Sequence, residues 1–344
     1  MTDRFTASSA EPAAAVSRAL LADCVRAATA APSLHNSQPW LFRIGAGHVD
    51  VYADRGRRLE VLDPVGREMM ISLGAAVFTL RLALRQAGHR PELQLLPESD
   101  RPDLVARVTA GRAAAPSAAV EALAAAIPHR HTNRWPFARS VVPADALEQL
   151  IDAARVEGAR LTVAGPVSRQ AILGLSSAAD RHLRANGHYR AELARWTVPG
   201  TGRRDGVPST AIGAWDALET MPIRDFGLLQ PQAGRANERF EPYPTIVVLA
   251  TEGDRTVHWL RAGQALQRVL LTATCWNLAT TPISQPVEIP AIRAVLADSR
   301  AGVWAQMVIR LGYGRPAPAT PRRALADVLL PPAVPGDTGA GGVG

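Results

Sequence analysis

At 344 residues, with 47% hydrophobic and 20% charged residues, the chain has the length and composition of a globular protein with one large domain or two ordinary ones. Its formal net charge is +7, but the arginines are scattered and few aromatic residues lie among them, so we expect no nucleic-acid partner. The sequence contains no lysine, which excludes a Walker-A lysine and a lysine Schiff base and leaves arginine, backbone N–H groups and hydroxyls to hold any anion.

Cysteines, apolar runs and histidines exclude further classes of protein. Cys24 and Cys275 lie far apart and form no CxxC pair, as suits a reducing compartment. The first fifteen residues lack the pattern of a signal peptide, and no run of about 18 apolar residues occurs. We therefore expect a cytoplasmic protein without a membrane span. His129 and His131 form an HxH pair without a second ligand cluster nearby, so we expect no metal site.

The first part of the chain alternates between helical and strand-like patterns. Apolar spacing and turn residues mark the boundaries of each element. The predicted elements are a helix at 16–30 ended by Pro32, a hairpin at 40–54, a helix at 69–84 ended near Gly88, a strand at 104–109, and an alanine-rich helix that ends before Pro128.

The second part repeats this mixture around a long irregular stretch. Residues 197–244 are rich in Gly, Pro and Arg, with a short helical piece near 210–218. The other predicted elements are helices at 142–154, 168–182, 189–196, 260–278 and 289–297, strands at 161–164, 245–251 and 303–312, and a turn at 280–286.

Two apolar helices resemble each other. The segments 72–88 and 261–277 align with Gly74 over Gly263, Ala76 over Ala265 and Leu80 over Val269. A chance resemblance between apolar helices is the alternative. Because similar elements flank both segments, we favour a degenerate internal duplication, in which the two helices pack together as those of two subunits would.

Two familiar sequence signatures do not apply. "GYGRPA" (312–317) fits GxGxxG/A formally, but the prolines that follow prevent the helix that a dinucleotide site requires. No GxSxG occurs, so a nucleophile elbow is not expected.

Three polar loops are more informative. "APSLHNSQPWLF" (31–42) is either an ordinary self-capping loop or a ligand-facing turn fixed by Trp40 and Phe42, and we favour the second. Arg130, Thr132 and Arg134 alternate, so in an extended segment they face one way and form a grip for an oxyanion. "PRR" (321–323) adds two arginines, and together the loops indicate a phosphorylated ligand.

These loops resemble four motifs of the flavin-dependent nitroreductases, in the same order. "APSLHNSQPWLF" resembles the PSxxNxQPW signature, "HRHTNRWPF" the RxSxR segment, "TTPISQ" the loop over the flavin, and "GYG…PRR" the C-terminal phosphate clamp. The length, the duplication, "RAELARW" and "RDGVP" resemble the Acg-like branch, in which one chain carries both halves.

The resemblance implies an α+β, nitroreductase-like fold with two related halves in one chain, forming a pseudo-dimer around a helical core. The implied segments are a flexible N-terminus at 1–14, a first, degenerate half at 15–126, a second half at 127–330 with a lid-like insert at 197–244, and a disordered tail at 331–344. Both halves in one chain suit a monomer, and a homodimer stays open.

The same resemblance implies FMN as cofactor and NAD(P)H as electron donor. Arg130 and Thr132, with Arg322 or Arg323, would hold the phosphate and ribityl chain, and Arg134 would lie near N1 and O2 of the flavin. The remaining implied contacts are Pro32, Ser33 and Asn36 from the first half and Pro282, Ile283, Ser284 and Gln285 along the ring. No catalytic side chain is expected, because the flavin carries the chemistry.

The chain departs from the family pattern in three respects. Ser284 stands where many members carry an acid, and Leu34 where a second serine is common. Neither PSxxNxQPW nor HRHTNR has a second copy, so one of two symmetric sites should be lost and one FMN should bind per chain.

The expected activity is NAD(P)H-dependent reduction of nitroaromatic, quinone or related small acceptors. The alternative is a protein that stores or sequesters FMN. In that case the apolar residues of the 197–244 insert would seal the flavin and prevent turnover.

Overall fold

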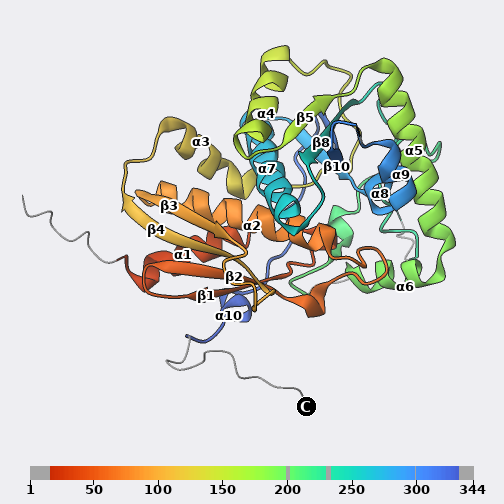
Figure 1. Cartoon of the computed structure of the whole chain (residues 1–344). Helices are drawn as coiled ribbons and strands as arrows, with labels where there is room; N and C mark the ends of the chain where they lie inside the picture. Colours follow the sequence, from red (N-terminus) through yellow and green to blue (C-terminus); the bar gives the residue numbers. More distant parts are fainter. Residues whose placement is uncertain (1–15, 199–201, 230–233, 299, 333–344) are drawn as a thin grey trace, which may run out of the picture.

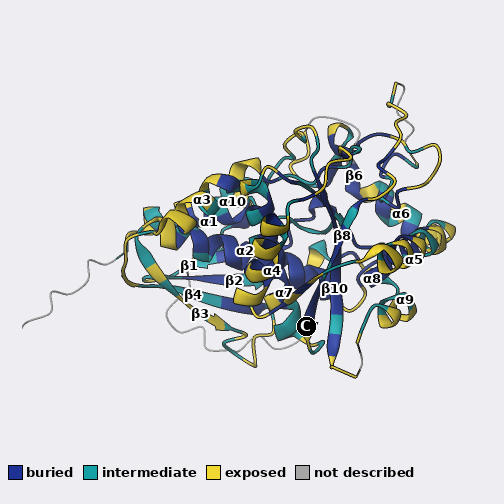
Figure 2. Ribbon diagram, turned by 90° about the horizontal axis from the view of Figure 1, so that it is seen from above, coloured by how far each residue is buried: buried dark blue, intermediate teal, exposed yellow. Residues whose placement is uncertain are grey.

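The computed structural model describes residues 16–198, 202–229, 234–298 and 300–332. Two four-stranded antiparallel sheets lie on opposite sides of two central helices, α2 (Arg67–Gln86) and α7 (Thr256–Cys275) (Figure 1). Figure 2 shows that α2 is buried along most of its length, whereas α5 (Pro166–Ala185) has an exposed outer face. The expected α+β arrangement of two related halves around a helical core is confirmed.

The two sheets have the same topology. In chain order the first unit contains α1 (Arg18–Ala28), β1 (Trp40–Ile44), β2 (His48–Ala53), α2, β3 (His89–Leu95), β4 (Leu104–Ala113) and α3 (Ala118–Ala126). The second contains α4 (Ala144–Val156), β5 (Arg160–Val163), β8 (Thr245–Glu252), α7, β9 (Ala279–Ile283) and β10 (Val303–Gly312). The strand orders β1-β2-β4-β3 and β5-β8-β10-β9 correspond one to one, as a duplication requires.

The contact between α2 and α7 is centred on the two glycines that the sequence alignment paired. A Cβ atom on Gly74 would overlap the carbonyl oxygen of Leu260, and one on Gly263 would overlap that of Ile71. Each oxygen belongs to the residue three positions before the opposite glycine. This reciprocity is the property of a twofold interface between like surfaces.

The end of the second unit reaches the sheet of the first. Leu329, just past α10 (Leu325–Val328), forms a parallel bridge with Phe42 of β1. Val328 is fully buried in the core of the first unit. At the start of the second unit, Thr132 forms a parallel bridge with Thr280 of β9.

We propose that 15–126 and 127–330 are the duplicated units and that 197–244 is an insert in the second. The common topology and the Gly74–Gly263 contact support this division. The flexible N-terminus expected at 1–14 and nearly all of the tail expected at 331–344 lie outside the described residues.

The insert and its surroundings add small elements. They are α6 (Gly187–Trp196), β6 (Thr197–Val198), β7 (Val207–Pro208), α8 (Gln285–Glu288) and α9 (Pro290–Val295). Most expected helices and strands are confirmed, with ends shifted by a few residues. The prediction of a helix near 210–218 is wrong. The structure has only a single 3₁₀ turn at Ser209–Ala211 in this region, because Gly213 adopts φ +85° and a helix cannot continue through it.

Two further elements differ from the sequence prediction. The prediction of a turn at 280–286 is wrong, because residues 279–283 pair with β10 as an edge strand and α8 follows directly. The edge strand β3 was missed. Its sequence, HRPELQL, is mostly polar and contains Pro91, and no residue in it is fully buried. Among the described residues, no helix has the length and apolar character needed to cross a lipid bilayer.

Substituting Gly263 tests the helix contact. Gly263→Ala should lower the free energy of unfolding by at least about 2 kcal/mol, because the added methyl group collides with backbone of α2. Gly174→Ala in α5 is the matched control. Its Cβ meets open space, so it should stabilise by about 0.5–1 kcal/mol. Chemical denaturation measures both, and equal stability of the two variants would contradict the close contact.

Candidate functional site

A cleft lies at the seam between the two units. Its space measures about 720 Å³, counting the part open to solvent. The first unit contributes the 32–35 loop and one face of α2. The second contributes Pro282, Ser284, Gln285, Leu266 and Met307, and the insert contributes Ile223, Arg224 and Phe226.

The 31–38 loop owes its shape to its amide side chains. Asn36 Nδ2 donates to the carbonyl oxygens of Gly206 and Pro321, and Gln38 Nε2 donates to that of Arg204. Both amide residues adopt positive φ angles. This left-handed conformation costs little free energy for asparagine, whereas for glutamine it requires stabilising contacts such as these hydrogen bonds. These bonds tie the loop to the insert and to the C-terminal segment.

Buried aromatic residues fix the far end of this loop. Trp40 and Phe42 begin β1 and are completely buried in the core of the first unit. Ser33 Oγ accepts a hydrogen bond from the backbone N–H of Gln38, which closes the turn. The loop is therefore a rigid wall of the cleft, and Pro32 and Ser33 border the space directly.

A smaller basic hollow continues the cleft. Pro32, Ser33, His35, Thr132 and Arg134 border both spaces. The hollow is completed by Asn36, Arg130, Val207, Thr320 and Arg322. Arg130, Thr132 and Arg134, which the sequence predicts to face one way, all border this hollow.

Arg130 is buried, Arg322 lies half-buried beside it, and neither has an acidic partner among the described residues. Each guanidinium donates to the carbonyl oxygen of Ala30, at 3.4 and 3.2 Å, and each has a buried Nε–H with no acceptor. Burial and the neighbouring Arg322 lower the pKa of Arg130 to about 9, and burial lowers the pKa of Arg322 to about 10. Two like charges held this way have N–H donors to spare, which are the groups that an anion requires.

Arg134 lies where the hollow meets the wider cleft. Its guanidinium donates to the carbonyl oxygen of Ala211 at 2.8 Å and lies 4.8 Å from the ring centre of Phe226. Burial, and secondarily Arg224, lower its pKa to about 10. It therefore presents a poorly solvated positive charge to any ligand in the cleft.

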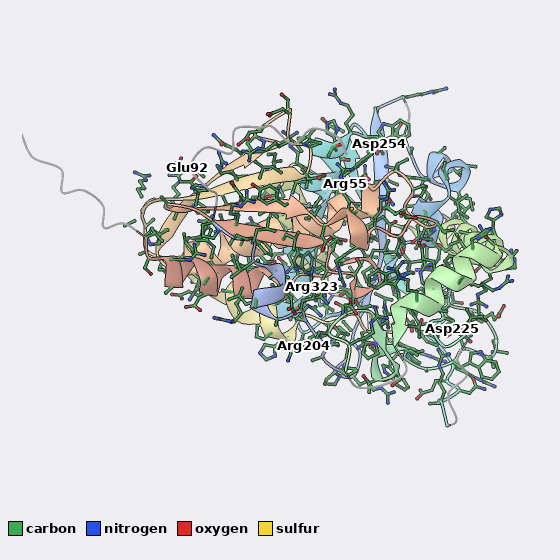
Figure 3. All side chains as sticks on the ribbon, turned by 90° about the horizontal axis from the view of Figure 1, so that it is seen from below. Arg55, Glu92, Arg204, Asp225, Asp254 and Arg323 are labelled. Carbon is green, nitrogen blue, oxygen red and sulfur yellow. The ribbon has the colours of Figure 1, made fainter. Side chains whose placement is uncertain are left out.

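Two of the expected site residues lie elsewhere. Arg323 donates to the carbonyl oxygens of Gln38, Trp40 and Asp327, so its guanidinium supports the 38–40 backbone and borders neither space (Figure 3). Ile283 is completely buried in a hydrophobic cluster. Arg322 borders the hollow and Arg323 does not, and the buried Ile283 can offer only backbone groups.

Several bordering residues were missed from the sequence. Both ring nitrogens of His35 are buried without a partner, and burial, Arg224 and Arg134 lower its pKa well below the usual value, so the ring is neutral at pH 7. Its position inside the PSxxNxQPW signature was the available signal. Glu68 and Arg224 do not lie in any sequence motif that would have identified them. Glu68 lies in the first turn of a helix, and Arg224 lies in the irregular insert.

Substituting Arg130 tests whether the hollow is an anion site. In chloride, Arg130→Met should stabilise the ligand-free protein by about 1–3 kcal/mol, because it removes a buried charge that has no acidic partner among the described residues. Inorganic phosphate should raise the melting temperature of the wild type above its value in chloride of equal ionic strength, and this increment should vanish in the variant. The exposed Arg139→Met is the control. A destabilised variant that keeps the phosphate increment would refute the anion site.

Comparisons with known proteins agree with this geometry. The chain is 33% identical over 312 residues to a Mycobacterium tuberculosis (strain H37Rv) protein named "Putative NAD(P)H nitroreductase Rv3131", with 88% of each chain covered. It is 29% identical over 328 residues to "Putative NAD(P)H nitroreductase acg" of the same strain, covering 92% of this chain and 97% of the relative.

Other comparisons add little. No family model matches the chain. A nitroreductase with bound FMN from Bacteroides fragilis shares 15% identity at a TM-score of 0.35, covering 59% of this chain and 93% of that one, a likeness too slight to carry an argument. The identity to the mycobacterial relatives extends over nearly the whole of both chains, and on that ground the chain belongs to the NAD(P)H nitroreductase family.

Proposed function

We propose that the protein is an FMN-dependent oxidoreductase that uses NAD(P)H to reduce nitroaromatic, quinone or related small acceptors. The observation that carries this proposal is a pair of cations, the buried Arg130 and the half-buried Arg322, which lie at one end of the cleft with no acidic partner among the described residues. Family membership and the names of the relatives support it.

The residues present fit FMN. Arg130 and Arg322 would hold the phosphate, with the Thr132 and Ser33 hydroxyls beside it. Asn36 Oδ1 accepts from Arg322 at 3.1 Å and so positions that guanidinium. Bound FMN would supply the transfer of hydride from NAD(P)H to the acceptor.

The protein's own part in the reaction is placement and charge. Arg134 would present a positive charge to the edge of the ring where the reduced flavin is negative. Pro282, Ser284 and Gln285 would follow the ring, and Gln285 is held by the carbonyl oxygen of Pro222 at 3.2 Å. Ile71 and Ala75 of α2 offer an apolar wall that keeps water away.

The alternative, an FMN-sequestering protein, is favoured by one observation. The insert carries Phe226 and Arg224 to the border of the cleft, and Arg224 is fastened there. Its guanidinium donates to both carboxylate oxygens of Glu288 at 2.6 Å and to the hydroxyl of Tyr189. A lid held by these bonds would leave no room for a nicotinamide ring to stack.

Flavin content and affinity test the cofactor proposal. The purified protein should be yellow, with one FMN per chain. Arg322→Gln should weaken FMN binding about 10- to 150-fold, the value of a lost charged hydrogen bond, and leave riboflavin binding unchanged. Arg139→Gln should bind like the wild type. A colourless protein that takes up no FMN, or two flavins per chain, would refute the proposal.

Anaerobic stopped-flow mixing with NADPH separates the enzyme from the sequestering protein. An enzyme should lose its flavin absorbance rapidly. If absorbance persists for minutes in the wild type and Phe226→Ala restores fast bleaching, the insert blocks the flavin and the protein sequesters FMN.

A further inference from the structure

Glu68 occupies an unusual place at the start of α2. It borders the cleft together with Ile71, Ser72 and Ala75, which share one face of that helix at spacings of three, four and seven. It also borders a second cavity, lined among others by Asp63, Arg67, Glu288 and Arg293. No other described residue borders both spaces, so Glu68 is the residue at which the two spaces come together.

The carboxyl group of Glu68 is only half used by the protein. Its Oε1 accepts a hydrogen bond from Arg67 at 2.6 Å, whereas Oε2 is buried and has no hydrogen-bond partner among the described residues. Arg67 is itself fixed by the carbonyl oxygens of Gln306 and Val287, at 2.8 and 3.2 Å. The residue is 3% exposed, so an oxygen with hydrogen-bonding capacity is held rigidly in a dry place.

The surrounding charges favour a neutral acid. Glu288 of α8 and Asp63, in the turn before α2, are the negative neighbours, and Arg67 and Arg224 of the insert are the positive ones. Burial and then Glu288 raise the pKa of Glu68 well above its usual value, against the opposing effects of Arg67 and Arg224. Arg224 is already committed to Glu288, which weakens its effect on Glu68.

The chemistry of the proposed function needs a proton here. Reduction of a quinone to a hydroquinone takes up one hydride and one proton. NAD(P)H supplies the hydride but not the proton, so the proton must come from another group. The other titratable groups at the cleft are His35, which is neutral at pH 7, and the arginines Arg134 and Arg224, which do not give up a proton. Glu68 is the carboxyl group among the described residues that border the cleft.

We propose that Glu68 is the acid that protonates the acceptor, and that it is recharged from the cavity on its other side. The inference rests on the proposed oxidoreductase function. The carboxyl O–H bond breaks as an O–H bond forms on the acceptor oxygen left negative by hydride addition. The resulting carboxylate then takes a proton from water in the second cavity, and all electrons come from NAD(P)H.

Glu68→Gln tests this role, because glutamine keeps the shape and the acceptor for Arg67 but has no acidic proton. The holoprotein is reduced anaerobically with dithionite and mixed either with benzoquinone or with ferricyanide, which takes up electrons without a proton. The ratio of the benzoquinone rate to the ferricyanide rate should fall about 100-fold or more in the variant. The wild-type benzoquinone rate should also fall as pH rises through the Glu68 pKa, and the variant should show no such fall.

A matched variant and a measurement independent of turnover complete the test. Glu92→Gln lies on the exposed edge strand β3 (Figure 3) and should keep the wild-type rate ratio. At neutral pH, the infrared difference spectrum of the wild type minus Glu68→Gln should contain the C=O band of a protonated carboxylic acid, and the difference spectrum of the wild type minus Glu92→Gln should not.

An unchanged rate ratio, or a difference spectrum of the wild type minus Glu68→Gln without a carboxylic acid band, would overturn the role of Glu68. Failure of NADPH to bleach the wild-type flavin would count against the proposed NAD(P)H-dependent function and not against Glu68, because dithionite supplies the electrons in this experiment. The two ideas therefore fail separately.

Discussion

The close packing of α2 against α7 is the constraint on which the site depends. Gly74 and Gly263 let the two backbones touch, and this contact sets how the two sheets face each other across the seam. The same helix α2 then serves two purposes. One face packs on α7, and another, with Glu68, Ile71 and Ala75, walls the cleft. A cleft built on a rigid helix pair holds its shape without a ligand.

The seam also explains how an anion site can be assembled from distant residues. Arg130 lies at the start of the second unit and Arg322 near its end, and both reach the carbonyl oxygen of Ala30 in the first unit. Holding two cations together with no acidic partner among the described residues destabilises the protein on its own, so the arrangement is explained best by an anion that offsets the cost.

The sequence predicted much of the fold and of the basic hollow, because the patterns that indicate them lie within short stretches of the chain. Apolar spacing defines α2 and α7, and the alternation of Arg130, Thr132 and Arg134 survives in the extended segment. The choice between Arg322 and Arg323 could not be made from the sequence, because adjacent residues point in opposite directions. Arg224 and Glu68 needed the tertiary structure, since the insert and the start of α2 meet only in space.

A crystal structure of the protein with FMN tests the central claim most directly. The account predicts a single flavin at the seam, with its phosphate oxygens within hydrogen-bond distance of the guanidinium groups of Arg130 and Arg322. A phosphate bound away from this pair, or a flavin bound outside the seam, would contradict it.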